Sequence, residues 1–443
     1  MSNATLLRGG YVVDPSQGID GRADVRVRDG RVTAVGKLTP DAGETVLDVD
    51  GLYVTPGWID VHVHLREPGQ EWKETIGTGT QAAAAGGFTT LFCMPNTQPA
   101  LDSVAMLEEL SRRVARDAVV RVHPIATISE GRRGRKPVDY DALARAGAVG
   151  FSDDGESTAD SGIMVDALRA SARLGVPVMV HCEDPNLIGG AMHEGAVSAR
   201  LGVKGIPAAA EEIFIERDLA LTAATGGWLH VCHVSTGKGI ADIARARRAG
   251  AHVTAEAMPH HLVMSDAWVG GSRTLELVGE PERARAKPAD PDTKVNPPLR
   301  PPTDAAALLA ALRGGDFEII STDHAPHAAI EKQGKPIQAA AFGLSGSEFA
   351  LPSLMALWQA GLLTMPEIVS AISTRPAHLW GLPGGTLRPG AVADVTVFDP
   401  TETWVPQAEA LRSRSANSPL VGLALTGKSK LTFVQGDLRH RDW

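Results

Sequence analysis

Hydrophobic and polar residues follow two different rhythms along this 443-residue chain. Near both ends, short apolar runs alternate with polar positions and are broken by turn residues, a pattern typical of small antiparallel strands. Between them, apolar runs of strand length alternate with longer segments of helical period. We therefore predict an α/β fold in which residues 55–379 form a TIM-like (β/α)8 barrel, and residues 1–54 and 380–443 together form a small β-sandwich domain.

Eight apolar runs are candidates for the strands of this barrel. They are residues 58–64, 88–94, 119–126, 149–153, 176–182, 228–234, 252–257 and 317–322. The helix-like segments between them include residues 74–85, 104–115, 161–174, 211–225, 239–249 and 303–312. Enzymes with this fold place their chemistry at the carboxyl ends of the strands. Polar residues at those ends are therefore the first candidates for a functional role.

The first apolar run ends in an Asp-x-His-x-His pattern made by Asp60, His62 and His64. Residues two apart on a strand point to the same side, so one strand offers two neighbouring imidazoles. Asp60 lies in the same alternation and could orient an imidazole by a hydrogen bond. Arg66 follows at the end of the run and offers a permanent cation to an anionic ligand. An isolated His-x-His pair more often packs or faces solvent, so its meaning depends on the other strand ends.

Side chains that can bind metal follow four of the other runs. They are Asp153 and Asp154, His181, His233 and Asp323. One carboxylate of the fourth run, the other three residues and the first histidine pair make a set of four imidazoles and two carboxylates, which is typical of zinc. A single catalytic zinc needs only three protein ligands and a water. We therefore expect two zinc ions per chain, bridged by a carboxylate and a hydroxide.

Composition narrows the classes of function. The net charge of −9 argues against sequence-independent binding to nucleic acid, and the basic residues 132–136 are best read as a solvated loop. No secretion signal is evident near Met1, and no run reaches the roughly 18 apolar residues of a membrane span. We therefore expect a cytoplasmic protein that does not bind membranes.

Three cysteines are too few for a disulfide framework, which fits a reducing compartment. Cys182 directly follows His181, and Cys232 directly precedes His233. Neighbours on a strand point to opposite faces. We therefore expect both cysteines to pack outward against helices while both histidines face inward.

Several longer motifs, taken together over essentially the whole chain, resemble the dihydroorotases of the amidohydrolase superfamily, in their longer bacterial type. The motifs are Asp60-x-His62-x-His64, Arg66-Glu67-Pro68-Gly69, Met94-Pro95-Asn96-Thr97, Asp153-Asp154-Gly155, His181-Cys182-Glu183, His260-His261, Lys294-Val295-Asn296-Pro297-Pro298 and Asp323-His324-Ala325-Pro326-His327. The resemblance implies a zinc-dependent cyclic amide hydrolase. Its reaction would be the reversible closure of N-carbamoyl-L-aspartate to L-dihydroorotate and water, in pyrimidine biosynthesis, by way of a hydroxide that bridges the metals.

The resemblance also implies a role for each site residue. One metal would be held by His62, His64 and Asp323, the other by His181 and His233, and the bridging carboxylate would be Asp154. Asp323 would in addition act as the catalytic base and acid. The carboxylate of the substrate would be bound by Arg66, Asn96 and His327, and the ring amide by Asn296. The implied partners are the small-molecule substrate, a second copy of the chain in a homodimer, and aspartate transcarbamoylase.

Two other readings stay open. Related cyclic amidases, such as allantoinase and dihydropyrimidinase, bridge their metals with a carboxylated lysine, whereas the fourth run here ends in Asp153 and Asp154 and has no lysine. Arg66 also counts against them. A non-catalytic dihydroorotase-like scaffold that binds aspartate transcarbamoylase is the second alternative. Such proteins typically lose metal ligands, and every ligand position is filled in this chain.

Overall fold

The computed structural model describes residues 4–275 and 289–443. Within these ranges, parallel strands of the central region form two sheets, with the neighbour orders β10-β9-β8 and β11-β14-β15-β16. The strands are β8 (Trp58–Val63), β9 (Phe88–Cys93), β10 (Arg121–Pro124), β11 (Val178–Val180), β14 (Leu229–Val231), β15 (Val253–Ala257) and β16 (Ile319–Ile320). Each lies inside one of the predicted runs, which confirms the α/β class.

Single bridges join these two sheets into a continuous series. Phe151, in the fourth predicted run, pairs in parallel with Ala126 beyond β10 and with Val178 of β11. Val63 at the end of β8 pairs in parallel with His324 beyond β16. The parallel pairing therefore returns to the strand on which it began, and we call this series the parallel ring. The fourth run contributes only the bridge at Phe151 and no strand of its own.

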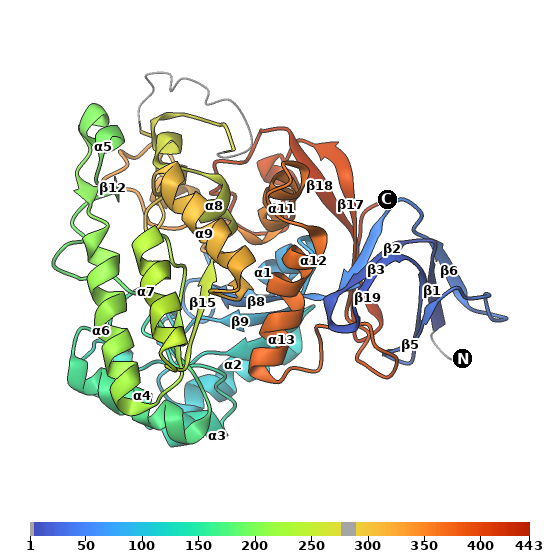
Figure 1. The fold of residues 1–443 in the computed structure, drawn as a ribbon, viewed down its shortest axis with the longest axis horizontal. Coiled ribbons are helices and arrows are strands. Elements are labelled where there is room, and N and C mark those ends of the chain that lie inside the picture. The colour runs from blue at the N-terminus through green and yellow to red at the C-terminus, as the bar shows by residue number, and fades with distance from the viewer. Residues whose placement is uncertain (1–3, 276–288) are drawn as a thin grey trace.

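Helices surround the parallel ring (Figure 1). The main ones are α1 (Ile76–Ala85), α2 (Val104–Asp117), α4 (Ser161–Leu174), α6 (Ala209–Thr225), α7 (Gly237–Arg248), α9 (Pro302–Gly314), α11 (Ala350–Gln359) and α13 (Arg375–Trp380). All six predicted helices are among them, with ends that agree within two residues. Capping hydrogen bonds fix where two of these helices begin. Asp160 accepts hydrogen bonds from Gly162 N and Ile163 N at the start of α4, and Thr236 accepts one from Gly239 N at the start of α7.

The inside of the parallel ring is packed with apolar side chains. This inner cluster consists of Ile59, Val61, Phe92, Met94, Ile125, Met179, Cys232, Ile319 and Ala377. Trp380 of α13 packs against it, with its ring 5.2 Å from that of Phe92 and its Nε1 donating to Val149 O. The cluster fills the ring, and Trp380 lies at its end near Val149, at the start of the fourth predicted run. The polar residues at the carboxyl-terminal ends of the strands therefore face the opposite side of the ring.

One predicted orientation inside the ring is wrong. Cys182 faces outward, and its Sγ lies 3.7 Å from Asp218 of α6, as expected. Cys232 instead belongs to the inner cluster. The reason is that His233 has a positive φ of 35°, which breaks the strand alternation, so that Cys232 and His233 both face the interior side.

The two ends of the chain form two sheets beside the ring (Figure 1). One has the order β5-β4-β1-β6, made of β1 (Ala4–Arg8), β4 (Asp24–Arg28), β5 (Arg31–Gly36) and β6 (Thr45–Asp48). The other has the order β19-β18-β17-β7-β2-β3, made of β2 (Tyr11–Asp14), β3 (Ile19–Arg22), β7 (Tyr53–Pro56), β17 (Val395–Trp404), β18 (Leu425–Val434) and β19 (Asp437–Arg441). The antiparallel pairing of β7 with β17 joins the two ends.

Both sheets contribute to one hydrophobic cluster. Leu7 and Val25 of the first sheet pack there with Val12, Val395 and Phe433 of the second. The alternating pattern of the chain ends therefore serves a shared core, as a pair of sheets packed face to face requires. Among the described residues, no helix combines the length and the apolar character that a membrane crossing needs.

Candidate metal centre

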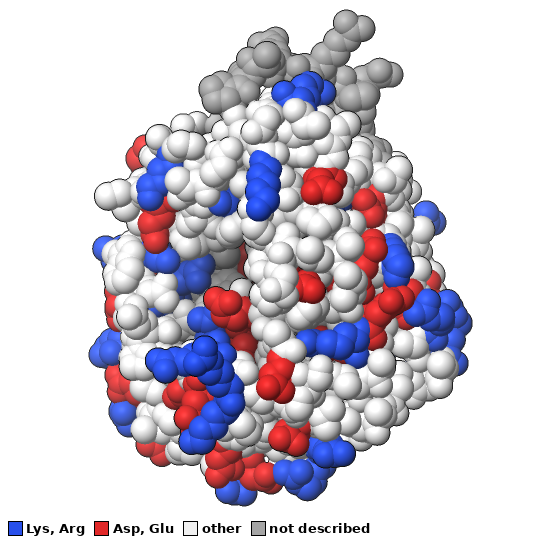
Figure 2. All heavy atoms as spheres, turned by 90° about the vertical axis from the view of Figure 1, so that its left-hand side faces the viewer, with Lys and Arg blue, Asp and Glu red and all other residues white. Residues whose placement is uncertain are grey.

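A cavity of about 410 Å³ opens at the carboxyl-terminal ends of the parallel strands. The face of the molecule shown in Figure 2 is hollowed and carries both basic and acidic side chains around the hollow. Nine of the ten predicted site residues line the cavity, and the tenth, His62, is fully buried. The nine are His64, Arg66, Asn96, Asp154, His181, His233, Asn296, Asp323 and His327.

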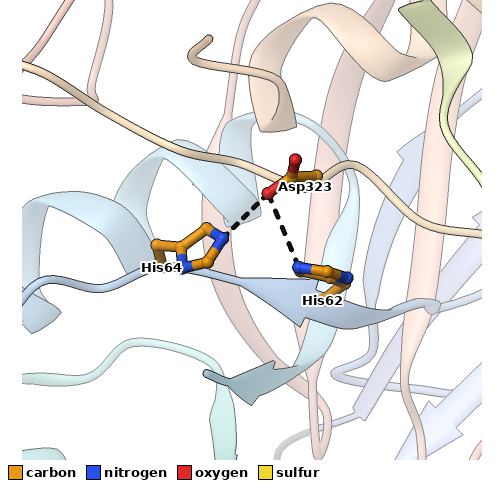
Figure 3. A group of neighbouring side chains, drawn as sticks. All are labelled: His62, His64 and Asp323. Atoms are coloured by element: carbon orange, nitrogen blue, oxygen red, sulfur yellow. Dashed lines mark hydrogen bonds and ion pairs between the residues drawn. The ribbon is translucent and has the colours of Figure 1, made fainter. Parts of the chain in front are cut away.

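His62, His64 and Asp323 converge on one point (Figure 3). His64 Nε2 lies 2.8 Å from Asp323 Oδ1, and His62 Nε2 lies 3.5 Å from the same oxygen. His62 Nε2 is buried and has no hydrogen-bond partner among the described residues. Buried polar atoms are normally satisfied, so an unpaired nitrogen that faces a carboxylate fits a metal ligand.

Asp154 lies between this group and a second pair of imidazoles. Its Oδ2 is 3.8 Å from His62 Nε2 and 3.6 Å from His64 Nε2. Its Oδ1 is 3.3 Å from His233 Nε2 and 3.4 Å from His181 Nδ1. One carboxylate thus offers a different oxygen to each histidine pair, which is the arrangement that a carboxylate bridging two cations requires.

The neighbouring Asp153 points elsewhere. Its Oδ1 accepts hydrogen bonds from Ile128 N and Ser129 N, and its Oδ2 accepts one from Thr158 Oγ1 at 3.2 Å. These contacts hold the loop after β10 against the fourth run. Of the two adjacent carboxylates, only Asp154 therefore lies among the histidines.

The electrostatics of the cluster favour positive charge between the carboxylates. Burial by itself would raise the pKa of Asp154, but the surrounding imidazoles, His62 foremost, hold that pKa well below its usual value. The pKa of Asp323 is lowered in the same way by His62 and His64. Burial opposes protonation of His181, yet hydrogen bonds to Asp154 and Glu183 raise its pKa to about 10. The carboxylates are therefore anionic and stabilise positive charge beside them, either on protonated imidazoles or on metal ions.

Three further side chains orient the histidines from behind. His62 Nδ1 donates to Glu256 Oε1 at 2.7 Å, His181 Nε2 donates to Glu183 Oε2 at 2.9 Å, and His64 Nδ1 donates to Asn96 Oδ1 at 2.9 Å. Each of these bonds leaves the opposite ring nitrogen facing Asp154 or Asp323.

Sequence reasoning did not assign this orienting role to Glu183 or Glu256. The signal for Glu183 was its place two residues after His181, on the same side of an extended chain. The signal for Glu256 was a single carboxylate in the otherwise uncharged strand β15.

Asp60 does not orient an imidazole, contrary to the prediction. Its Oδ1 accepts hydrogen bonds from the backbone nitrogens of His62 and Thr322, and its Oδ2 accepts one from Thr322 Oγ1 at 2.6 Å. The pairing register of β8 shifts between Asp60 and Val63, and this irregularity breaks the alternation on which the prediction rested. Asp60 instead ties the end of β8 to the chain beyond β16, and burial raises its pKa to about 7.

A permanent cation lies on the other side of the cavity. Arg66 has a φ of 61°, donates from Nε to Pro326 O at 3.2 Å and from Nη2 to His327 Nε2 at 3.3 Å. Burial lowers its pKa to about 10, which leaves it charged at neutral pH. Asn296 Nδ2 lies 3.2 Å from His181 Nε2, and its Oδ1 is buried without a hydrogen-bond partner among the described residues. The cavity therefore combines a metal-competent side with a side suited to an anion, which we call the anion-binding side.

Comparisons with known proteins agree on the family. The Dihydro-orotase-like family profile matches residues 51–239. A dihydroorotase of Anaeromyxobacter dehalogenans is 42% identical over 444 aligned residues, covering 100% of this chain and 99% of the relative. A dihydroorotase of Aquifex aeolicus is 38% identical over 439 residues, with 99% of each chain covered. This chain belongs to the dihydroorotase family.

Solved structures similar to this member of the dihydroorotase family include a hydantoinase and a dihydropyrimidinase. The L-hydantoinase (dihydropyrimidinase) of Arthrobacter aurescens superposes with a TM-score of 0.83 at 25% identity, covering 98% of this chain and 95% of that one. The dihydropyrimidinase of Brevibacillus agri superposes with a TM-score of 0.83 at 23% identity, covering 100% of this chain and 95% of that one. These structures share the fold, whereas the whole-length relatives at higher identity are dihydroorotases.

Proposed function

We propose that this chain is a dihydroorotase that catalyses the reversible closure of N-carbamoyl-L-aspartate to L-dihydroorotate and water in pyrimidine biosynthesis. The observation that carries the proposal is the position of Asp154 between two histidine pairs, with Arg66 lining the same cavity. Whole-length identity of 42% to a dihydroorotase supports it. We also infer that the parallel ring is a (β/α)8 barrel domain of residues 55–379, and that residues 1–54 and 380–443 form the second domain.

Two zinc ions fit the donor set of the cavity. His62, His64 and Asp323 would hold one, His181 and His233 would hold the other, and Asp154 would contact both. Imidazole nitrogen and carboxylate oxygen are usual zinc donors, and His62 Nε2 needs such a partner. When bound, a pair of zinc ions lowers the pKa of water and polarises a carbonyl.

The anion-binding side of the cavity would hold the carboxylate that the substrate keeps throughout the reaction. The guanidinium of Arg66 provides a planar, permanently charged fork for it. His327 Nε2 lies beside that fork, and the side chain of Asn96, whose Oδ1 accepts the hydrogen bond of His64 Nδ1, lines the same cavity. The unpaired Oδ1 of Asn296 is suited to accept a hydrogen bond from a ring N–H.

Asp323 would move the proton in both directions. In hydrolysis it accepts a proton from the attacking water and then donates a proton to the ring nitrogen that leaves the carbonyl. In closure the terminal nitrogen of the carbamoyl group attacks the side-chain carboxyl group and loses one proton through Asp323 to the oxygen that leaves as water. One further proton is taken up from solvent, because a carboxylate becomes a neutral amide. The low pKa of Asp323 keeps it in the basic form before water attacks.

The structural neighbours favour one alternative enough to test it, namely a hydantoinase or dihydropyrimidinase activity. Such substrates carry no carboxylate on the ring carbon that bears it in dihydroorotate. Arg66 would then have no anion to bind. A non-catalytic scaffold is opposed by the filled ligand set. The cytoplasmic location, the homodimer and the aspartate transcarbamoylase partner stay predictions.

The decisive experiment measures turnover of L-dihydroorotate, dihydrouracil and allantoin by the purified chain, together with its metal content. We expect about two zinc ions per chain and turnover of L-dihydroorotate alone. Removing metal with a chelator should abolish this turnover, and adding zinc should restore it. Comparable turnover of dihydrouracil would support the alternative enzyme, and a metal-free chain without turnover would support the scaffold.

A further inference from the structure

Asn417 contacts the anion-binding side of the cavity from a distant part of the chain. It lies in the segment between β17 and β18, residues 405–424, and its side chain is only 5% exposed. Its Oδ1 accepts a hydrogen bond from His327 N at 2.9 Å and lies 2.9 Å from Ser345 Oγ, whose single hydrogen it shares with Ser415 O. Its Nδ2 donates to Gly343 O at 3.1 Å and to Ala325 O at 3.3 Å. One amide therefore joins the chain before His327 to the loop at Gly343.

The backbone around Asn417 is held independently of its side chain. Ser345 N donates to Asn417 O at 3.0 Å, and Ser345 Oγ donates to Ser415 O at 2.7 Å. Ser415 Oγ donates to Lys73 O at 2.6 Å, and Arg414 N donates to Glu74 Oε1 at 3.1 Å. Because these bonds anchor the segment at the ring, the amide of Asn417 acts from a fixed position.

The residues that Asn417 holds are those that face the anion-binding part of the cavity. His327 and Gly343 both line it. Pro326 O, adjacent to His327, accepts the hydrogen bond from Arg66 Nε. A displacement of this stretch would therefore move His327 and the carbonyl that orients Arg66 together.

We propose that Asn417 is a positioning residue for recognition of the substrate carboxylate, acting through His327 and Arg66. The inference rests on the proposed dihydroorotase function and adds the segment 405–424 to the machinery of specificity. Only a primary amide of this length can accept two hydrogen bonds and donate two in opposite directions. An aspartate would lose both donors and place a negative oxygen against two carbonyl oxygens.

The test compares Asn417→Ala and Asn417→Asp with the wild-type chain and with Asn186→Ala, which removes an exposed asparagine in the turn after Glu183. We expect KM for L-dihydroorotate to rise about tenfold or more in both Asn417 variants, as for one misplaced hydrogen bond to a charged group. The zinc content should stay at the wild-type level and kcat should change less than KM. Calorimetric Kd values for orotate, which carries the same carboxylate on a similar ring, should weaken in parallel.

Ser345→Ala provides a milder second variant, since it removes the hydroxyl that Asn417 Oδ1 and Ser415 O share and keeps the bond from Ser345 N to Asn417 O. It should raise KM in the same direction by a smaller factor, and it carries the test if the Asn417 variants do not fold. Unchanged KM and unchanged orotate Kd in a folded variant would overturn the inference while leaving the proposed function intact. Loss of zinc or of kcat with unchanged KM would also overturn it. A wild-type chain without dihydroorotase turnover would contradict the proposed function instead, and the orotate Kd values would still test Asn417.

Discussion

The two sides of the cavity are built in different ways. On the metal-competent side, His62 belongs to β8, and His64, His181 and His233 each lie one or two residues beyond a strand of the parallel ring. Their positions follow directly from the pairing of the strands. On the anion-binding side, His327, Gly343 and Asn417 lie outside every helix and strand of the described chain. Side-chain hydrogen bonds to the backbone hold them in place.

This difference separates a part of the scaffold that the strands fix from a part that the loops can change. The hydantoinase of Arthrobacter aurescens shares the fold at 25% identity, which is consistent with a common frame of strands. Loops tolerate substitution far better than paired strands do, so the side that reads the substrate can change while the strand ends stay in place. Changes on the metal-competent side should therefore affect kcat or metal binding, and changes on the anion-binding side should affect KM.

The largest effect should come from Asp323→Asn. The amide keeps the shape of the side chain but cannot accept the proton of the attacking water, so we expect kcat to fall about 1,000-fold. Steady-state kinetics with L-dihydroorotate, at a verified zinc content, measures this change. A kcat within tenfold of the wild type would show that another group transfers the proton.

Arg66→Lys should act mainly on KM. Lysine keeps the positive charge but loses the planar fork, so we expect KM for L-dihydroorotate to rise about 10- to 100-fold with kcat within a few-fold of wild type. Arg135→Lys, an exposed replacement of the same kind, serves as the control. If kcat fell as much as KM rose, the division between the two sides of the cavity would be wrong.

Glu256→Gln should weaken metal binding. Glu256 Oε1 accepts the hydrogen bond of His62 Nδ1, and the loss of its charge makes the imidazole a weaker ligand. We expect zinc affinity to fall about 10- to 100-fold, measured by competition with a chelator of known affinity. Glu130→Gln, at the exposed first residue of the 3-10 helix η2 (Glu130–Arg132), is the control, and an equal affinity in both variants would contradict an orienting role for Glu256.

Lys332 should produce the smallest effect, on stability rather than on turnover. Its buried Nζ donates to Gly343 O and to Lys294 O, and burial lowers its pKa from 10.5 to about 8. Between these two pH values the folded chain binds fewer protons than the unfolded chain. Its contribution to stability therefore rises with pH through this window and is lost as pH falls through about 8.

Urea unfolding at pH 8, 9 and 10 tests this linkage. The unfolding free energy of the wild type should rise with pH more steeply than that of Lys332→Met, by up to about 1.4 kcal/mol per pH unit. The comparison of the two chains cancels the titration of other groups. Parallel pH profiles would mean that Lys332 titrates normally in the folded chain.

Local pattern was enough for much of the fold and for the members of the candidate site. The helical period placed α4 at residues 161–174, and the apolar runs contained each strand of the parallel ring. The same pattern placed His62, His64, His181, His233 and Asp323 at strand ends, and the structure brings their side chains together around Asp154. Periodicity is a property of neighbours along the chain, so sequence alone can reveal it.

Tertiary structure decided which partner each side chain meets. The register shift in β8 turned Asp60 toward backbone nitrogens, and the positive φ of His233 placed Cys232 in the inner cluster. Glu256 reaches His62 across 194 residues, and Asn417 reaches His327 across 90. These contacts depend on segments that meet only when the ring closes and the carboxyl-terminal segment crosses it, and no local repeat in the sequence encodes such a meeting.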